Sequence, residues 1–224
     1  MKLLAVDTSF EACSAAITVD GSPLWATTRL IGRGHAEILP VMVAEGFQAS
    51  GLAPLDLDRI GVVIGPGTFA GLRVGLAFAR GLALGGRARV IGVTSLAALA
   101  ASLGQGRAIA SVVDARRGQI YAALFDKDLS VRLAPFVAAP AQAAASILAA
   151  ATGPFMVTGS GAAIVAPFLS AAADHSAQRR IDPLAVARLA AAATAIDAPA
   201  SPLYLRPPDA APGAPSIFSE AREE

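Results

Sequence analysis

The chain has 224 residues, of which 54% are hydrophobic and 16% are charged, and its formal net charge is +1. This composition is typical of a compact globular protein with little surface charge, and it favours apolar surface that a partner covers. A balanced charge without a long basic block argues against tight, independent binding of nucleic acid.

No apolar run approaches the roughly 18 residues that a membrane-spanning helix needs, and the opening apolar run is too short for a secretion signal. The single cysteine, Cys13, allows no disulfide within the chain, so we expect a reducing, cytoplasmic setting. Its alternating strand pattern favours a buried hydrophobic residue over a reactive thiol. The two histidines, His35 and His175, fall in different halves, so we expect no metal site built on histidine.

In the first half of the chain we expect three strands, followed by helices that alternate with further strands. The expected strands cover residues 3–6, 13–19, 24–30, 60–64 and 89–93, and the expected helices cover residues 37–50, 72–84 and 95–103. Asp20 and Gly21 form the predicted hairpin turn between the second and third strands. We expect Gly51 to end the first helix and Thr94 to cap the third.

The second half of the chain repeats this order of elements. The expected strands cover residues 108–113, 119–125, 129–137 and 155–158, and the expected helices cover 140–151, 162 to near Ser170, and 183–194 with Asp182 as cap. We therefore predict an α/β protein of two lobes, residues 1–104 and 105–206. Each lobe is one copy of a duplicated βββαβα unit and contains a mixed sheet. Prolines interrupt the rest, and we expect a disordered tail over residues 207–224.

The most distinctive segment is the run Gly65-Pro66-Gly67-Thr68-Phe69-Ala70-Gly71-Leu72-Arg73, which joins a predicted strand to a predicted helix. Its spacing matches neither G-x-x-x-x-G-K-[ST] nor G-x-G-x-x-G, the two common nucleotide-binding patterns. One interpretation is a backbone cradle for phosphate. The other, which we favour, is a tight structural turn that leads into a closely packed helix.

A second candidate lies where the first strand ends, at Asp7-Thr8-Ser9, with Asp114 in the equivalent place of the second lobe. Strand ends of this kind often face ligands, so a phosphate- or metal-facing site is one interpretation. A turn in which the carboxylate only satisfies the local backbone is the alternative, and both stay open. The residues of this candidate nucleotide or anion site, which would be vestigial, are Asp7, Thr8, Gly65, Gly67, Thr68, Arg73 and Asp114.

The helix expected at residues 72–84 is apolar almost all round, which predicts burial on both faces. Its small residues Gly71, Gly75 and Ala79 are four apart and form a smooth stripe. One side of this helix would cover the sheet, and the other would need a second helix, which we expect another chain to supply.

Several segments resemble the TsaB (YeaZ) family, in order and with the spacing of that family. They are Leu4-Ala5-Val6-Asp7-Thr8-Ser9, Cys13-Ser14, His35-Ala36-Glu37-Ile38-Leu39-Pro40, the glycine-rich run 65–73, Asp114-Ala115-Arg116-Arg117 and Tyr204-Leu205-Arg206. Ala36, Thr68 and Ala70 depart from the usual residues, and the missing hydroxyl at Ala70 weakens a phosphate-binding role. The resemblance implies a two-lobed actin-like ATPase (ribonuclease H-like) fold.

The resemblance also implies a role in forming threonylcarbamoyladenosine beside the anticodon of tRNAs that read ANN codons. In that family the chemistry belongs to the paralogue TsaD, which holds metal through an H-x-x-x-H motif. This sequence has no such motif. We therefore expect a non-catalytic scaffold subunit with no metal and no cofactor of its own, with a nucleotide at the partner interface left open.

The partners implied are a TsaD-like subunit, a small TsaE-like ATPase, a second copy of the chain when it is alone, and tRNA only through the complex, with no membrane. The family pairs through the first two helices of the first lobe. The expected contact residues are His35, Glu37, Ile38, Met42, Leu72, Gly75, Leu76 and Ala79. Gly75→Arg is expected to disrupt assembly and leave the monomer folded. The alternative is a phosphotransferase or ATPase that uses Asp7, Thr8, Gly67 and Asp114; a protease ranks last.

Overall fold

The computed structural model describes residues 1–169, 173–176, 180–194 and 199–206, and the expected disorder of residues 207–224 lies outside them. The first half forms β1 (Lys2–Asp7), β2 (Ala12–Val19), β3 (Ser22–Leu30), α1 (His35–Ser50), η1 (Pro54–Asp56), β4 (Arg59–Gly65), α2 (Phe69–Leu84) and β5 (Arg89–Thr94). Its sheet has the order β3-β2-β1-β4-β5, with β1 antiparallel to β2 and parallel to β4.

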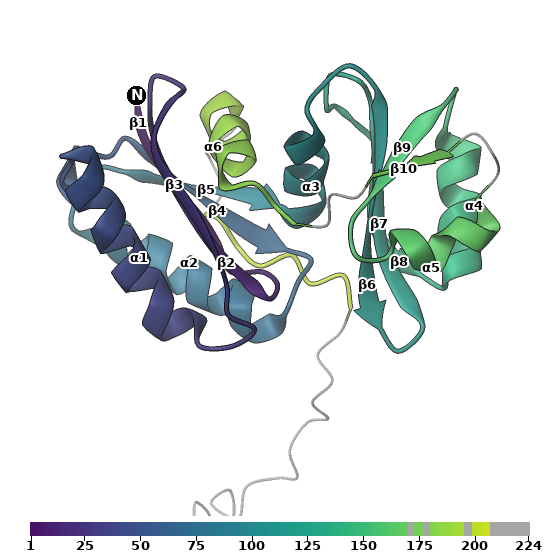
Figure 1. Cartoon of the computed structure of the whole chain (residues 1–224), viewed down its shortest axis with the longest axis horizontal. Helices are drawn as coiled ribbons and strands as arrows, with labels where there is room; N and C mark the ends of the chain where they lie inside the picture. The colour runs from purple at the N-terminus through teal and green to yellow at the C-terminus, as the bar shows by residue number, and fades with distance from the viewer. Residues whose placement is uncertain (170–172, 177–179, 195–198, 207–224) are drawn as a thin grey trace, which may run out of the picture.

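Helix α3 (Ser95–Leu103) ends the first half. The second half forms β6 (Ala108–Arg116), β7 (Gln119–Phe125), β8 (Val131–Ala138), α4 (Pro140–Ala150), β9 (Phe155–Thr158), α5 (Ala162–Val165), η2 (Ala166–Phe168), β10 (Ala173–His175) and α6 (Pro183–Ala192). Its sheet has the order β10-β9-β6-β7-β8. Strand β6 is antiparallel to β7 and parallel to β9, so β6 occupies the place that β1 holds in the first sheet. The predicted duplication with two mixed sheets is confirmed (Figure 1).

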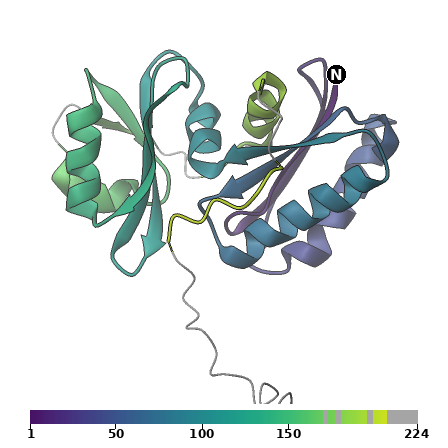
Figure 2. The ribbon, with the colours of Figure 1, turned by 180° about the vertical axis from the view of Figure 1, so that it is seen from behind.

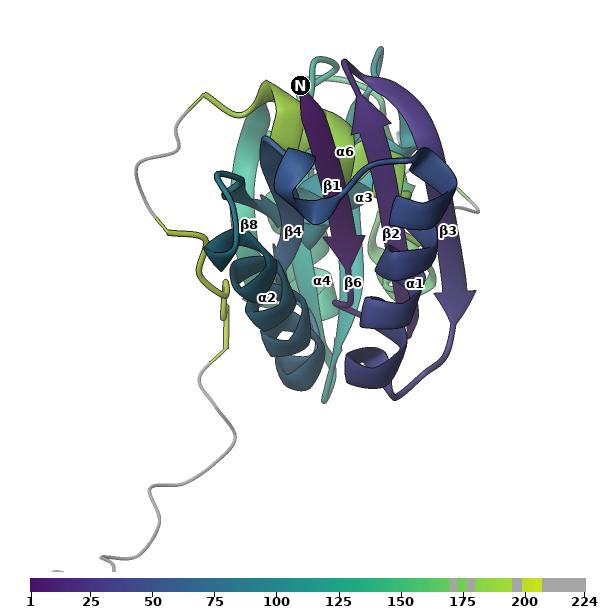
Figure 3. The same cartoon turned by 90° about the vertical axis from the view of Figure 1, so that its left-hand side faces the viewer.

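Helices α1 and α2 lie side by side on the outer face of the first sheet (Figure 3). Their inward side chains, such as Leu39, Met42 and Leu76, join the apolar core formed with β1, β2 and β4. Helix α4 covers the outer face of the second sheet. No helix in the described ranges is long and apolar enough to cross a membrane.

Helices α3 and α6 lie between the two sheets (Figure 1). Helix α6 packs on the first sheet, although the chain reaches it only after the second. Arg59 of β4 fixes its end, because Nη1 donates to the carbonyl oxygens of Ala190, Ala191 and Ala193 at 2.8–3.0 Å. The predicted assignment of residues 183–194 to the second lobe is therefore corrected. The position of a helix is decided by the sheet on which its apolar face packs, and for α6 this is the first sheet.

Two helices begin earlier than expected. Helix α1 starts at His35 instead of residue 37, directly after Gly34, which has a left-handed conformation. Helix α2 starts at Phe69 instead of residue 72, because Thr68 caps it by accepting a hydrogen bond from the Gly71 amide at 3.3 Å. The caps predicted at Thr94 and Asp182 are confirmed.

The end of the second lobe departs more from the expectation. The helix predicted from residue 162 to near Ser170 is a short α5 followed by the 3-10 turn η2, and Ser170 lies outside the described residues. Pro167 lies within η2, where it removes one backbone donor. Strand β10 was not predicted, because three residues at a sheet edge carry too little pattern to be detected.

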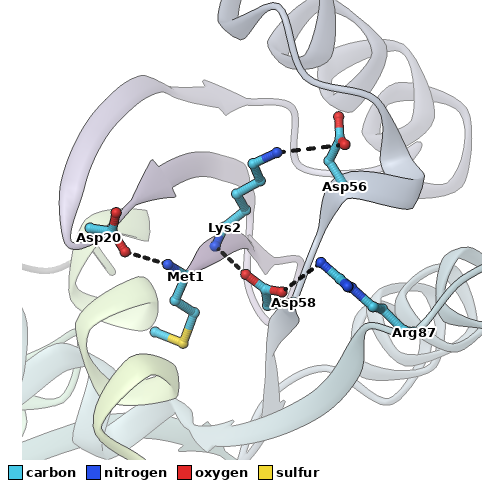
Figure 4. Close-up of polar contacts among 6 residues, drawn as sticks. All are labelled: Met1, Lys2, Asp20, Asp56, Asp58 and Arg87. Atoms are coloured by element: carbon cyan, nitrogen blue, oxygen red, sulfur yellow. Dashed lines mark hydrogen bonds and ion pairs between the residues drawn. The ribbon is translucent and has the colours of Figure 1, made fainter.

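Figure 4 shows a polar cluster at the start of β1, formed by Met1, Lys2, Asp20, Asp56, Asp58 and Arg87. The Lys2 backbone amide donates to Asp58 at 2.7 Å, and this bond is the main cause that lowers the pKa of Asp58. The Ala53 amide donates to Asp56 at 2.8 Å and likewise lowers the pKa of Asp56, with help from the Lys2 ammonium. These carboxylates are therefore engaged at the end of β1 opposite Asp7.

Ser111 of β6 is a buried side chain whose hydroxyl oxygen has no hydrogen-bond partner. Ser111→Ala is expected to raise the free energy of unfolding by about 1 kcal/mol, because it removes an unsatisfied polar group. Ser95→Ala is the matched control: Ser95 is equally buried but donates to the Pro66 carbonyl oxygen at 2.5 Å, so its loss is expected to cost about 1 kcal/mol. Urea denaturation measures both, and a less stable Ser111→Ala would contradict the prediction.

Candidate functional site

A cleft of about 1290 Å³ lies where the ends of β1 and β6 meet the starts of α1 and α2. Of the residues predicted for an anion site, Asp7, Gly67, Thr68 and Asp114 line this cleft. Thr8, Gly65 and Arg73 are not among its lining residues. The topology thus brings the two equivalent aspartates to one cavity, as expected for strand ends of a duplicated fold.

Asp7 is buried and its carboxylate is engaged locally. Its Oδ1 accepts from the Ser9 backbone amide at 2.8 Å and from the Ser9 hydroxyl at 2.6 Å, which is the geometry of an Asx turn. Burial raises the pKa of Asp7, although the two bonds from Ser9 act in the opposite direction. The structure therefore favours the alternative in which this carboxylate organises the turn at the end of β1.

Asp114 repeats this arrangement in the second lobe. Its Oδ1 accepts from the Arg116 backbone amide at 2.8 Å, and its own amide donates to the Ser160 hydroxyl at 3.1 Å. The Arg116 guanidinium lies 3.5 Å from Asp114 Oδ2, so this arginine pairs within its own turn. Two equivalent Asx turns consequently face the cleft, one from each lobe.

The glycine-rich run packs its backbone directly against the turn after β1. The Thr68 amide donates to the Ser9 carbonyl oxygen at 2.8 Å, and the Thr8 hydroxyl donates to the Gly71 carbonyl oxygen at 2.7 Å. A Cβ at Gly67 would lie 2.6 Å from the Ser9 carbonyl oxygen, and one at Gly71 only 2.0 Å from that of Thr8. This close approach of two backbones explains the glycines without a phosphate.

Asp7→Asn is expected to raise the melting temperature at pH 7, because asparagine keeps the Oδ1 acceptor and removes the buried charge. A raised pKa means that the folded state binds the proton more tightly. The advantage of the variant should therefore shrink as the pH falls toward 3.8, the ordinary value for Asp7. Asp56→Asn is the control of opposite sign, since its pKa is lowered and its loss should destabilise at pH 7. Thermal unfolding across this pH range measures both, and an Asp7→Asn variant that melts lower at pH 7 contradicts the argument.

Cys13 and His35 lie beside this turn, and both side chains are buried. Burial is the main cause that raises the pKa of Cys13, to about 11, so the predicted buried thiol is confirmed. His35 Nε2 lies 3.3 Å from the Ala12 carbonyl oxygen at the start of α1. Within the described part of the chain, no three His, Cys, Asp or Glu side chains gather where they could hold a metal ion.

Comparisons with known proteins place the chain in a family. The family model described as TsaD, tRNA N6-adenosine threonylcarbamoyltransferase, matches residues 29–145. The tRNA threonylcarbamoyladenosine biosynthesis protein TsaB of Escherichia coli is 37% identical over 132 residues, 57% of this chain and 56% of that protein. The solved structure of YeaZ from Pseudomonas aeruginosa has a TM-score of 0.76 at 30% identity, and the match covers 91% of this chain and 99% of that chain.

The chain belongs to the TsaB (YeaZ) family. A second Pseudomonas aeruginosa structure, described as similar to peptidase YEAZ, agrees, with a TM-score of 0.77, 32% identity, and coverage of 92% of this chain and 99% of its own. The alignments to the curated TsaB relatives span about half of their length, 56% and 52% for the first two. Ethanolamine utilization protein EutJ from Carboxydothermus hydrogenoformans, 14% identical with a TM-score of 0.50, shares the fold alone over 84% of this chain and 89% of its own. The predicted two-lobed actin-like fold is confirmed.

Most of the contact residues expected in this TsaB-family chain face its own sheet. The buried ones are His35, Met42, Leu72, Gly75, Leu76 and Ala79. A Cβ at Gly75 would lie 2.6 Å from the Thr8 hydroxyl oxygen, so the stripe of small residues packs against the end of β1 at this position. These six residues are buried within the chain and so offer little surface to a partner, whereas Glu37 is exposed and Ile38 is half-buried.

The apolar side chains that α1 and α2 do expose are different ones. We call them the outer helical face: Val41, Ala44, Phe69, Ala77 and Leu84. Val41 is 52% exposed, Phe69 47% and Leu84 89%. The signal that could have found them is helical phase, since they fall between the buried positions. It was missed because a helix that is apolar all round does not tell which side the sheet takes.

Proposed function

We propose that this chain is a non-catalytic scaffold subunit in the formation of threonylcarbamoyladenosine in tRNA. The curated relatives carry that biosynthesis in their names, and the TsaD model that matches residues 29–145 relates the chain to a threonylcarbamoyltransferase. In this proposal the chain binds a TsaD-like catalytic paralogue, and a TsaE-like ATPase joins the pair. The tRNA is reached only through the complex, in the cytoplasm.

The outer helical face is the observation that carries the proposal. Val41, Phe69 and Leu84 are large apolar side chains that are exposed. They belong to α1 and α2, which are neighbouring helices (Figure 3). Uncovered apolar surface of this kind is typical of a protein interface, and burying it favours association. The same face would pair two copies of the chain when the catalytic subunit is absent.

The test is to mix the purified chain with the catalytic subunit from the same organism and measure the mass by light scattering. The expected result is a single species with the mass of a heterodimer at micromolar concentration. Two separately eluting species would overturn the proposal. Depleting the chain in cells should then lower the threonylcarbamoyladenosine content of tRNA, as nucleoside analysis measures.

The cleft is the observation that favours the second candidate, an actin-fold phosphotransferase or ATPase. Asp7, Gly67 and Asp114 line a cavity of about 1290 Å³. The hydrogen bonds of both aspartates favour the scaffold role over the enzyme, because each carboxylate already accepts a backbone hydrogen bond within its own turn. ATP binding by calorimetry, together with turnover that Asp7→Asn abolishes, would favour the enzyme; an Asp7→Asn chain that still assembles supports the scaffold.

A further inference from the structure

The last described segment, residues 199–206, crosses from the first lobe to the second (Figure 2). We call this segment the strap. It contains Tyr204-Leu205-Arg206, which the proposed scaffold role leaves unexplained. Tyr204 and Arg206 both line the cleft between the lobes.

The strap is bonded to the first lobe through β4 and α2. The Leu203 amide donates to the Ile64 carbonyl oxygen at 2.7 Å, and Arg80 Nη2 donates to the Ala200 carbonyl oxygen at 2.5 Å. A Cβ at Gly65 would lie 2.8 Å from the Leu203 carbonyl oxygen, so this glycine lets the strap approach the end of β4. The strap is therefore seated on the first lobe by its backbone.

Tyr204 attaches the strap to the outer helical face. Its ring stacks on that of Phe69 with centroids 5.3 Å apart, and Arg73 Nε lies 3.3 Å from its hydroxyl oxygen. The Arg73 guanidinium also lies over the Phe69 ring, with its central carbon 3.7 Å from the ring centroid. A partner that covers Phe69 would thus touch the group that holds Tyr204.

Arg206 attaches the other end of the strap to the second lobe. Its Nη1 donates to the Ala115 carbonyl oxygen and to Gln119 Oε1, both at 3.2 Å. These acceptors flank the turn between β6 and β7. Bonds from a guanidinium are charge-assisted and stronger than neutral ones, and these are partly buried.

The lobes also touch elsewhere, where α3 and α6 pack between the sheets. Arg188 of α6 donates to the Ala101 carbonyl oxygen at 3.1 Å, and the Asp182 amide donates to the Ser102 hydroxyl at 2.9 Å. Figure 1 shows this helix pair near one end of the lobes and the strap near the other. A rotation about the packed helices would therefore separate the lobes most at the strap.

We propose that the strap sets how far the two lobes open and couples that opening to a partner on the outer helical face. Tyr204 anchors one end beside Phe69, and Arg206 anchors the other on the β6–β7 turn. Coupling of this kind is reciprocal. Loss of the Arg206 bonds must therefore lower the affinity for a partner that binds α2 when the lobes are closed. The coupling rests on the proposed function, whereas the setting of lobe distance does not.

The first experiment measures the distance between spin labels at Gln48→Cys on α1 and Gln142→Cys on α4, both exposed positions. Cys13 is buried with a raised pKa and stays unlabelled. The full chain is expected to give one narrow distribution, which Arg206→Ala broadens and shifts. Arg132→Ala is the matched control, because its 2.7 Å bond to Asp126 stays within the second lobe. If Arg206→Ala leaves the distance distribution unchanged, the proposal that the strap sets the lobe opening is wrong.

Gln119→Ala removes one of the two acceptors and leaves Arg206 in place, so it is expected to give a smaller shift. Its result keeps the test valid if Arg206→Ala folds poorly.

The second experiment measures the affinity of each variant for the catalytic paralogue. Arg206→Ala is expected to weaken binding at least about fivefold, and Arg132→Ala to leave it unchanged. Equal affinity of Arg206→Ala and the natural chain overturns the coupling. If the natural chain does not bind the catalytic paralogue at all, the proposed function is wrong. The distance measurement alone then tests whether the strap sets the lobe opening.

Discussion

Gly71→Ala is expected to lower the free energy of unfolding by about 3 kcal/mol. The added Cβ would lie 2.0 Å from the Thr8 carbonyl oxygen and 2.6 Å from Thr68 Oγ1. Both neighbours are held: Thr8 follows β1 directly, and Thr68 caps α2. The helix can make room only by moving away from the sheet, which opens the core beneath Leu72 and Leu76.

Gly81→Ala in the same helix is the matched control. Nothing lies within 4 Å of a Cβ at Gly81, so alanine there is expected to stabilise the protein by about 0.5–1 kcal/mol through helix propensity. Chemical denaturation of both variants measures the difference. Equal stabilities would mean that the turn after β1 and helix α2 are not packed as described.

The same packing changes the expectation for Gly75→Arg. The sequence suggested a variant that stays folded and fails to assemble. Because a Cβ at Gly75 would lie 2.6 Å from the Thr8 hydroxyl oxygen and 3.4 Å from Val62, we now expect an unfolded first lobe. A test of the interface must therefore use exposed positions.

Val41→Asp is expected to weaken the heterodimer with the catalytic subunit by about thirtyfold or more, the cost of a disrupted hot spot of 2 kcal/mol. Val41 is 52% exposed on α1, so a charge there is solvated in the free chain and loses that solvation when a partner covers it. Calorimetric titration with the catalytic subunit measures the affinity.

Val131→Asp is the matched control for this prediction. Val131 is 60% exposed on β8 of the second lobe, away from the outer helical face. It is expected to leave both the affinity and the melting temperature unchanged. If both valine variants bind like the natural chain, the outer helical face is not the docking surface, and the exposed apolar residues of the second lobe become the next to test.

Local patterns were sufficient for most of the secondary structure. Residues 13–19 alternate with the two-residue period of a strand, and the apolar residues of the first helix recur with the 3.6-residue period of an α-helix. These two periods predicted β2 and α1. Thr94 and Asp182 were recognisable as caps because capping depends on residues a few positions away. The short β10 carried too few residues for a pattern, and η2 contains a proline within an apolar run.

The candidate site was only half predictable. The sequence brought Asp7 and Asp114 to equivalent strand ends, since the order of elements repeats. It left open whether Asp7 faces a ligand or its own backbone, because that depends on where Ser9 places its amide and hydroxyl. It also assigned Gly75 to a partner surface, because a stripe of small residues allows close packing whatever lies opposite.

By itself, the sequence determined the two βββαβα units, the buried Cys13 and the unusual glycine turn, because each depends on neighbours within a few residues. Only the tertiary structure decided that α6 covers the first sheet and that Gly71 meets Thr8. It alone also showed that the strap joins Phe69 to the second lobe through Tyr204 and Arg206. These contacts join residues that are distant in the chain. Local periodicity fixes which face of an element is apolar, but packing selects what covers that face.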